Sequence, residues 1–181
     1  GPNDWLVIAG SIPPPIGPEA YPQLLNLAHQ AGSHTVLDAD AEALAAGLTG
    51  RPEIVKTNHH EAERLLGRSL VSDELLLGAA DEMRAAGAAT AIITAGARGA
   101  VMVSEAAAWW CRPPETVVVS SVGAGDALLA GLLYQLETGH GIEFVTDLLW
   151  GAPLGMPVAE GVWAGWDLSE LVRVDGAAAP R

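Results

Sequence analysis

A run of small residues in the second half of the chain has the spacing of an anion-binding turn. Residues Ser120–Asp126 read SSVGAGD, and they stand between the β-branched run Val117–Val119 and the apolar run Ala127–Leu133. This order predicts a strand, a glycine turn and a helix. The first N–H groups of a helix have no partner within it, and the helix dipole places partial positive charge there. The turn therefore has the chemistry to hold a phosphate or another anion.

Four residues of this turn suggest chemistry as well as binding. Gly123, Ala124 and Gly125 would let an anion approach the backbone closely, because glycine carries no Cβ. Asp126 comes next, and a carboxylate beside an anion site repels the anion unless it takes part in a reaction. Asp126 therefore either caps the helix or acts on a substrate as a base. The turn by itself leaves both readings open.

A second polar cluster, Lys56–Glu61 (KTNHHE), follows a short apolar run and begins a predicted helix. Asn58 and Glu61 are three residues apart, so they share one face of that helix and have the spacing of a capping box. They could also serve a metal site, with Glu61 orienting water around Mg²⁺ and Asn58 fixing a phosphate or that water. Asn58 and Glu61 can cap the helix and serve a metal site at the same time. His59 and His60 are adjacent and should diverge, which favours a solvated first turn over a joint metal site.

The loop Thr94–Gly99 (TAGARG) follows another predicted strand and contains a G-x-x-G pattern. Turns between strands commonly need glycine, so this pattern alone is weak evidence for a ligand. The backbone of the loop could nevertheless line a nucleotide. Arg98 would then face either a phosphate or solvent.

Strands alternate with helices along most of the chain. Apolar runs predict strands at 5–9, 34–37, 54–56, 90–94 and 117–119 and a hairpin of 100–104 with 107–111. Helical spacing predicts helices at 18–31, 40–48, 58–66, 72–86 and 125–137, with a more ambiguous one at 143–152. This alternation predicts a mostly parallel sheet covered on both faces, with ligands beyond the carboxyl ends of its strands. The continuous apolar run Trp5–Ala9 predicts a strand buried on both faces.

Two further sets of residues have structural roles as their simplest interpretation. Asp38 and Asp40 lie between a predicted strand and a predicted helix, so we expect them to cap that helix. Five tryptophans lack the spacing of a sugar-binding platform, and we expect them to pack within the protein: Trp109, Trp110, Trp150, Trp163 and Trp166.

Composition limits the class of protein. The chain has 181 residues, 50% of them hydrophobic, and a net charge of −13, which argues against a nucleic-acid surface. No apolar run reaches the roughly 20 residues of a membrane span. The single cysteine, Cys111, agrees with a reducing compartment, so we expect a cytoplasmic protein. The chain begins at Gly1 rather than Met and reaches a strand-like run by Trp5, so we expect it to be part of a longer protein.

Together these motifs resemble the ribokinase-like (PfkB-type) carbohydrate kinases. Ser120–Leu133 fits the family signature D/N/S-T/S-x-G-A-G-D and the small-residue helix that follows it. Trp5–Pro14 is similar to a strand and "GSLPPG" loop, Lys56–Glu61 to "KPNxxE", and Thr94–Gly99 to "SLGxxG". The set most resembles the branch that phosphorylates sugar phosphates, which includes 1-phosphofructokinase and tagatose-6-phosphate kinase.

The resemblance implies a fold and a role for each motif. The fold would be α/β, a ribokinase-like three-layer αβα arrangement with a mostly parallel central sheet. Asp126 would be the catalytic base toward a sugar hydroxyl, and Gly123, Ala124 and Gly125 would form the anion hole for the transferred phosphoryl group. ATP and Mg²⁺ would be required.

The remaining site residues implied by the resemblance belong to the nucleotide side. Lys56, Asn58 and Glu61 would form a phosphate and Mg²⁺ network in which Glu61 reaches the metal through water. The nucleotide itself would be lined by Thr94, Gly96, Arg98 and Gly99.

The chain departs from the family pattern at several positions. Thr57 replaces the usual proline, Pro15 a glycine and Ala95 a leucine, and Gly151–Pro153 interrupts a helix expected near the adenine. The resemblance implies that residues 1–175 are the C-terminal, nucleotide-binding part of such a kinase, and we expect 176–181 to form a tail. We expect the N-terminal strands, the lid and most sugar contacts to lie outside this chain.

The expected reaction is transfer of phosphate from ATP to fructose 1-phosphate, giving the 1,6-bisphosphate. Tagatose 6-phosphate, an unphosphorylated sugar or a nucleoside are alternative substrates, and a nucleotide-binding piece without catalysis is a further alternative. The expected partners are the sugar phosphate and ATP, without nucleic acid or membrane. The full-length form could be a homodimer, because the lid often mediates dimers in this family.

Overall fold

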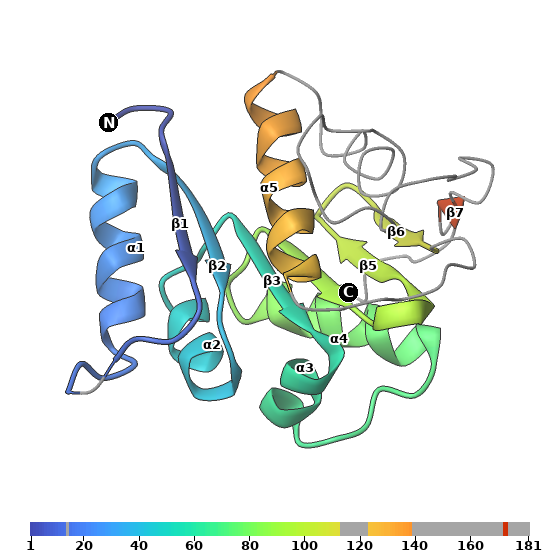
Figure 1. Ribbon diagram of the computed structural model, residues 1–181. Helices are drawn as coiled ribbons and strands as arrows, with labels where there is room; N and C mark the ends of the chain where they lie inside the picture. Colours follow the sequence, from blue (N-terminus) through green and yellow to red (C-terminus); the bar gives the residue numbers. More distant parts are fainter. Residues whose placement is uncertain (14, 113–122, 139–171, 174–181) are drawn as a thin grey trace. The chain divides into compact units, whose positions relative to one another are not determined.

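The computed structural model describes residues 1–13, 15–112, 123–138 and 172–173 (Figure 1). The chain forms two compact units, one of residues 1–94 and 101–108 and one of residues 95–100 and 109–181. The first unit alternates strands and helices as predicted. Its elements are β1 (Trp5–Ala9), α1 (Ala20–Gln30), β2 (His34–Asp38), α2 (Ala41–Leu48), β3 (Ile54–Asn58), α3 (His59–Leu66), α4 (Asp73–Ala85), β4 (Thr90–Thr94) and most of β5 (Ala100–Val103).

Strands β1 to β4 form a parallel sheet in which the spatial order follows the sequence (Figure 1). Each crossover connection therefore leads to the neighbouring strand, always on the same side of the strand before it. Because such crossovers are right-handed, helices α1 to α4 lie on one face of these strands. Successive helices also contact one another along that face. The predicted parallel α/β arrangement is confirmed.

The core of the first unit is made by the central strands and the helix faces that cover them. Strands β2, β3 and β4 contribute aliphatic side chains that are at most 3% exposed, namely Val36, Leu37, Ile54, Val55, Ile92 and Ile93. The expectation that the Trp5–Ala9 run is buried on both faces is wrong, since Val7 is 39% exposed. Within the described residues, β1 is the terminal strand and pairs with β2 alone, which leaves its outer side uncovered.

Several helix boundaries follow from local sequence signals. Gly32, after α1, and Gly67, after α3, both have positive φ, as predicted for helix C-termini. The Ser72 hydroxyl accepts a bond from the Leu75 N–H at the start of α4. Asp40 occupies the N-cap position of α2 but its side chain makes no capping bond, so that expectation is wrong.

The second unit contains a short 3₁₀ turn η1 (Gly96–Arg98), most of β6 (Ala108–Cys111), α5 (Ala124–Glu137) and β7 (Val172–Arg173). β6 pairs antiparallel with β7. The turn of the predicted hairpin is present after β5, where the Ser104 N–H donates to the Ala107 carbonyl at 2.9 Å. The predicted strand at 117–119 and the predicted helix at 143–152 lie outside the described residues.

Trp110 packs in the second unit as expected for a structural tryptophan. Its side chain is 4% exposed, its indole N–H donates to the Arg98 carbonyl at 3.2 Å, and the Arg112 guanidinium lies 5.4 Å from its ring centre. Trp109 is partly exposed. Trp150, Trp163 and Trp166 lie outside the described residues.

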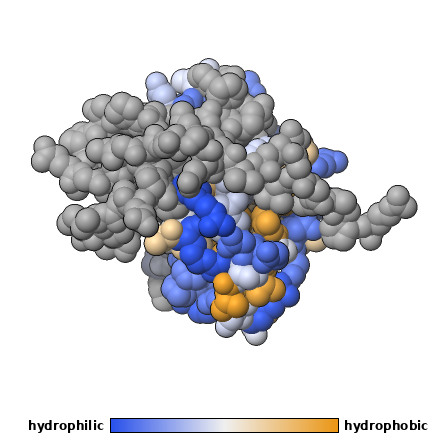
Figure 2. Space-filling model, turned by 90° about the vertical axis from the view of Figure 1, so that its right-hand side faces the viewer, coloured by the Kyte–Doolittle hydropathy of each residue, from blue (hydrophilic) through white to orange (hydrophobic). Residues whose placement is uncertain are grey.

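The described surface is largely polar. On the face shown in Figure 2, the residues not drawn in grey are mainly hydrophilic, with separate hydrophobic patches between them. None of the helices in the described ranges combines the length and hydropathy that a membrane span needs.

Two glycines near the C-terminal half of α4 provide a matched test of this packing. Gly87 has a φ of +141°, and a Cβ there would collide with the Leu48 carbonyl oxygen, whereas a Cβ at the exposed helical residue Gly78 would meet nothing within 4 Å. We expect Gly87→Ala to lower the free energy of unfolding by about 2 kcal/mol or more. Gly78→Ala should raise it by about 0.5–1 kcal/mol. Urea unfolding of both variants measures the difference, and equal effects would contradict the observed contact.

Candidate active site

The carboxyl ends of β2, β3 and β4 gather polar residues of the first unit. Asp38 lies opposite Lys56 in the β2–β3 register, and Asn58 lies opposite Thr94 in the β3–β4 register. The Thr94 hydroxyl donates to the Thr57 carbonyl at 3.4 Å. The structure therefore brings Lys56, Asn58 and Thr94 to one edge of the sheet. Ligands of parallel α/β sheets bind at this edge.

Asn58 and Glu61 form the capping box that their spacing predicts. The Glu61 N–H donates to Asn58 Oδ1 at 3.0 Å, and the Asn58 N–H donates to Glu61 Oε2 at 2.9 Å. The Thr57 hydroxyl donates to the same Oε2 at 2.9 Å. Among the described residues, Glu61 Oε1 has no hydrogen-bond partner, so one oxygen is held and the other is available.

This arrangement fits Mg²⁺ held through water. Carboxylate and amide oxygens suit this hard cation, which keeps several of its waters and usually takes only one or two protein carboxylates together with phosphates. The part of the chain that the structure describes contains no group of three His, Cys, Asp or Glu residues able to hold a metal directly. A single free carboxylate oxygen, Glu61 Oε1, is therefore suited to the outer coordination shell.

Lys56 is buried against Asp38. Lys56 Nζ donates to Asp38 Oδ2 at 2.7 Å, and the two side chains are 8% and 12% exposed. The expectation that Asp38 caps the next helix is therefore wrong. The signal that could have revealed the pair is opposite charge at the ends of two consecutive parallel strands, which adjacent register brings together.

The two histidines at the start of α3 lie together rather than apart. The ring centres of His59 and His60 are 3.8 Å apart and their planes make an angle of 38°. His60 exposes 72% of its side chain, whereas Nδ1 of His59 is buried without a hydrogen-bond partner among the described residues. The expected divergence is therefore wrong, and the expected solvation of this first turn holds for His60 but not for Nδ1 of His59.

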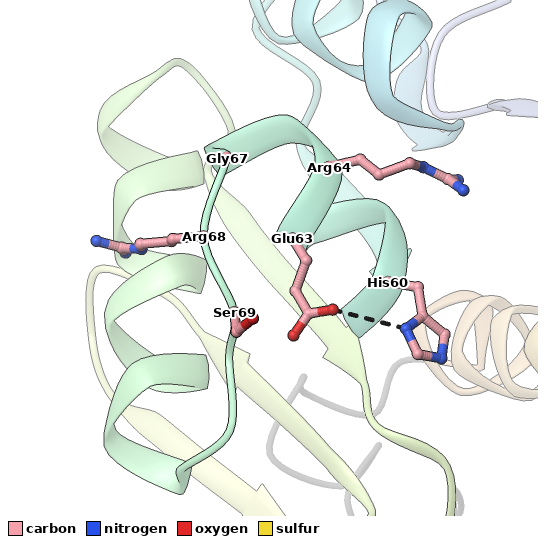
Figure 3. A pocket seen from close by; sticks show the side chains of 6 residues that line it. All are labelled: His60, Glu63, Arg64, Gly67, Arg68 and Ser69. Atoms are coloured by element: carbon pink, nitrogen blue, oxygen red, sulfur yellow. Dashed lines mark ion pairs between the residues drawn. The ribbon is translucent and has the colours of Figure 1, made fainter.

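A surface hollow runs along α3 and the residues after it, from His60 to Ser69, and the side chains that line it do not point toward one common position. Figure 3 shows Glu63 directed toward His60, while the Arg64 and Arg68 side chains extend away from each other. Glu63 accepts the Leu70 N–H at 2.7 Å, and that bond is the main reason why the pKa of Glu63 lies below its usual value; the exposed His60 contributes less. The Glu63 carboxylate thus holds the loop that follows α3 against the helix.

The Thr94–Gly99 loop has the conformation of a tight turn. Gly96 and Gly99 have φ values of +58° and +98°, which only glycine adopts readily, and the Ala95 N–H donates to the Gly99 carbonyl at 2.7 Å. Arg98 is partly exposed, and its carbonyl accepts the Trp110 indole bond. The turn therefore depends on its two glycines, and its assignment to the nucleotide remains a prediction.

The start of α5 is an uncapped helix N-terminus. Gly123 takes the N-cap position with a φ of +79°, and no side chain caps this end among the described residues. Ala124, Gly125 and Asp126 are the first three helical residues, so their N–H groups lack helical partners. A Cβ on Gly123 would meet nothing within 4 Å, and the Asp126 side chain is exposed. Asp126 lies inside the first turn and is not the N-cap residue.

Comparison with known proteins identifies the family. Residues 1–146 match the family described as pfkB family carbohydrate kinase. The chain belongs to that family. It is 42% identical over 152 residues to the 1-phosphofructokinase of Rhodobacter capsulatus, covering 84% of this chain and 48% of that protein. It is 40% identical over 137 residues to that of Haemophilus influenzae, covering 75% of this chain and 44% of that protein.

Solved structures of similar kinases agree with the fold. Phosphofructokinase-2 from Escherichia coli, in complex with substrates and products, matches with a TM-score of 0.72 and 30% identity, covering 80% of this chain and 48% of that one. Its tetrameric inhibited form matches with a TM-score of 0.74 and 31% identity over the same shares. The ribokinase-like α/β fold is thereby confirmed. The chain spans about half the length of the curated pfkB relatives it matches.

The Asp38–Lys56 pair gives a stability prediction for this pfkB chain. Lys56→Met should lower the free energy of unfolding by about 3–5 kcal/mol, because the Asp38 carboxylate would stay buried without its partner charge. Adding Asp38→Asn to that variant should recover much of the loss. Arg68→Met, which breaks the exposed pair with Glu82, is the matched control and should cost less than about 1 kcal/mol. Urea unfolding measures all three variants, and similar losses for Lys56→Met and Arg68→Met would contradict the buried pairing.

Proposed function

We propose that this chain supplies the ATP-binding and catalytic part of a kinase that transfers phosphate from ATP to fructose 1-phosphate. The observation that carries the proposal is the start of α5, where Gly123 takes the N-cap position in its left-handed conformation, no described side chain caps the helix, and Asp126 is exposed in the first turn. An anion site next to a carboxylate suits phosphoryl transfer to a hydroxyl group.

Each residue at the start of α5 has a defined task in this proposal. The Asp126 carboxylate accepts the proton of the sugar hydroxyl as its oxygen attacks the γ-phosphorus and the bond to the ADP oxygen breaks. The N–H groups of Ala124 and Gly125 donate to the transferred phosphoryl oxygens. Such fixed donors stabilise charge that develops in the transition state and need no reorganisation when the reaction occurs. The net charge of −13 makes local N–H donors especially important for holding an anionic substrate.

The residues at the carboxyl edge of β3 would serve the nucleotide phosphates. Mg²⁺, when bound with ATP, would neutralise phosphate charge. Glu61 Oε1 would accept a hydrogen bond from water bound to that cation, and the Asn58 amide would donate to a phosphate or the same water. Lys56 would place ammonium N–H donors near this region, with Asp38 fixing the ammonium group and balancing its charge. The turn formed by Gly96 to Gly99 would line the nucleotide.

The choice of sugar rests on the relatives. The curated proteins reported above are 1-phosphofructokinases, and their identity to this chain reaches 42%. Fructose 1-phosphate is therefore the proposed acceptor. Residues 1–175 would form the nucleotide-side part of the kinase. We further propose a cytoplasmic location, which a chain with a single cysteine suits, and a homodimeric complete enzyme.

Substitution of the proposed base tests the reaction. In the complete product of the reading frame, Asp126→Asn should lower kcat by about 100-fold or more while leaving ATP affinity near that of the parent, because the amide cannot accept the proton. Glu137→Gln, at the opposite end of the same helix, is the control and should leave kcat unchanged. A coupled assay of ADP release measures turnover. Turnover of Asp126→Asn within a few-fold of the parent would remove Asp126 from this role.

Binding measurements separate catalysis from nucleotide binding alone. Calorimetry on this chain with ATP and Mg²⁺ should detect binding, and the assay then adds fructose 1-phosphate, tagatose 6-phosphate or fructose. Turnover by the chain itself would exclude a purely binding role. Absence of nucleotide binding would contradict the proposed assignment of the Asn58–Glu61 and Gly96–Gly99 regions.

A further inference from the structure

Thr57 is a fully buried hydroxyl residue next to the proposed phosphate and Mg²⁺ network. It lies in β3 one residue before Asn58, and its side chain is 0% exposed. Its hydroxyl has two acceptors within reach, Glu61 Oε2 at 2.9 Å and the Asn58 carbonyl at 3.4 Å. A hydroxyl has one proton, and the shorter bond to a charged oxygen is the stronger one. The Thr57 hydroxyl therefore donates its hydrogen bond to Glu61 Oε2.

The two oxygens of the Glu61 carboxylate have different environments as a result. Oε2 accepts bonds from both the Thr57 hydroxyl and the Asn58 N–H, each at 2.9 Å. Oε1 has no such partner within the described ranges. Because the Thr57 hydroxyl is buried, solvent does not readily take its place as a donor. The second donor restricts rotation about the last bond of Glu61 and thereby limits the directions that Oε1 can take.

We propose that Thr57 is a positioning residue that holds Glu61 so that Oε1 points at the water shell of the Mg²⁺ bound with the nucleotide. This inference rests on the proposed function and concerns a residue where the family motif has proline, which carries no side-chain donor. Mg²⁺ requires near-ideal octahedral geometry, so an acceptor for its waters is effective only when its direction is fixed. Partners that orient such acceptors commonly affect metal affinity strongly.

Three variants of one position test the hydroxyl. Thr57→Val removes it and keeps the branched shape, whereas Thr57→Ser keeps it. Calorimetry follows ATP binding to the chain while free Mg²⁺ is varied, and far-UV circular dichroism reports folding. We expect Thr57→Val to raise the half-saturating Mg²⁺ concentration about tenfold and Thr57→Ser to change it by less than about twofold. If Thr57→Val does not fold, Thr57→Ala removes the hydroxyl without adding apolar volume and replaces it in the comparison.

A second substitution determines whether Thr57 acts through Glu61. In a Glu61→Gln background, Thr57→Val should change the Mg²⁺ requirement no further, since coupled residues are not additive. If Glu61→Gln raises the half-saturating Mg²⁺ concentration and Thr57→Val leaves it unchanged, the role of Thr57 is overturned and the proposed function stands. If Glu61→Gln leaves the half-saturating Mg²⁺ concentration unchanged, the proposed function is overturned instead. Equal loss of ATP affinity in the Val and Ser variants at saturating Mg²⁺ would assign Thr57 to packing and overturn the inference.

Discussion

The parallel register of β2, β3 and β4 determines where the polar side chains of the first unit lie. A shift by one residue along a strand would turn every side chain to the opposite face. In the observed register Asp38 is opposite Lys56, and Asn58 is opposite Thr94. The aliphatic residues of the same strands are packed in that register, and a slip would disrupt their packing. Hydrophobic burial therefore decides which charges and amides meet at the carboxyl edge, although the aliphatic side chains contact no ligand themselves.

The starts of α3 and α5 use the same helix physics for opposite purposes. At α3, Asn58 and Glu61 satisfy each other's backbone donors, so the helix dipole stabilises a carboxylate of the protein itself. At α5, Gly123 provides no side-chain cap, and no side chain in the described ranges caps the first N–H groups. The first arrangement presents a negative oxygen, which suits the water around a cation. The second presents N–H donors, which suit an anion. Phosphoryl transfer with Mg²⁺ needs both kinds of site.

Local sequence signals predicted most of the fold and part of the candidate site. The C-terminal glycines of α1 and α3 and the Asn58–Glu61 capping box were predictable, because each depends on residues within one turn. The partner of Asp38 was not, since Lys56 is 18 residues away and reaches it only through the pairing of β2 with β3. The exposure of Val7 was also missed, because apolar composition does not reveal which strand has a neighbour on each side. Tertiary pairing decides these features.

The residue that precedes Asn58 departs from the family motif and brings a side-chain donor to Glu61. A proline at this position would offer Glu61 no side-chain donor, and the carboxylate would be held by the Asn58 N–H alone. Thr57 adds a second donor to the same oxygen from a fully buried position. A β-branched residue also suits the end of a buried strand better than proline does, because it keeps its backbone N–H. The substitution therefore joins strand formation and carboxylate orientation in one side chain, and that makes Thr57 more than a neutral exchange.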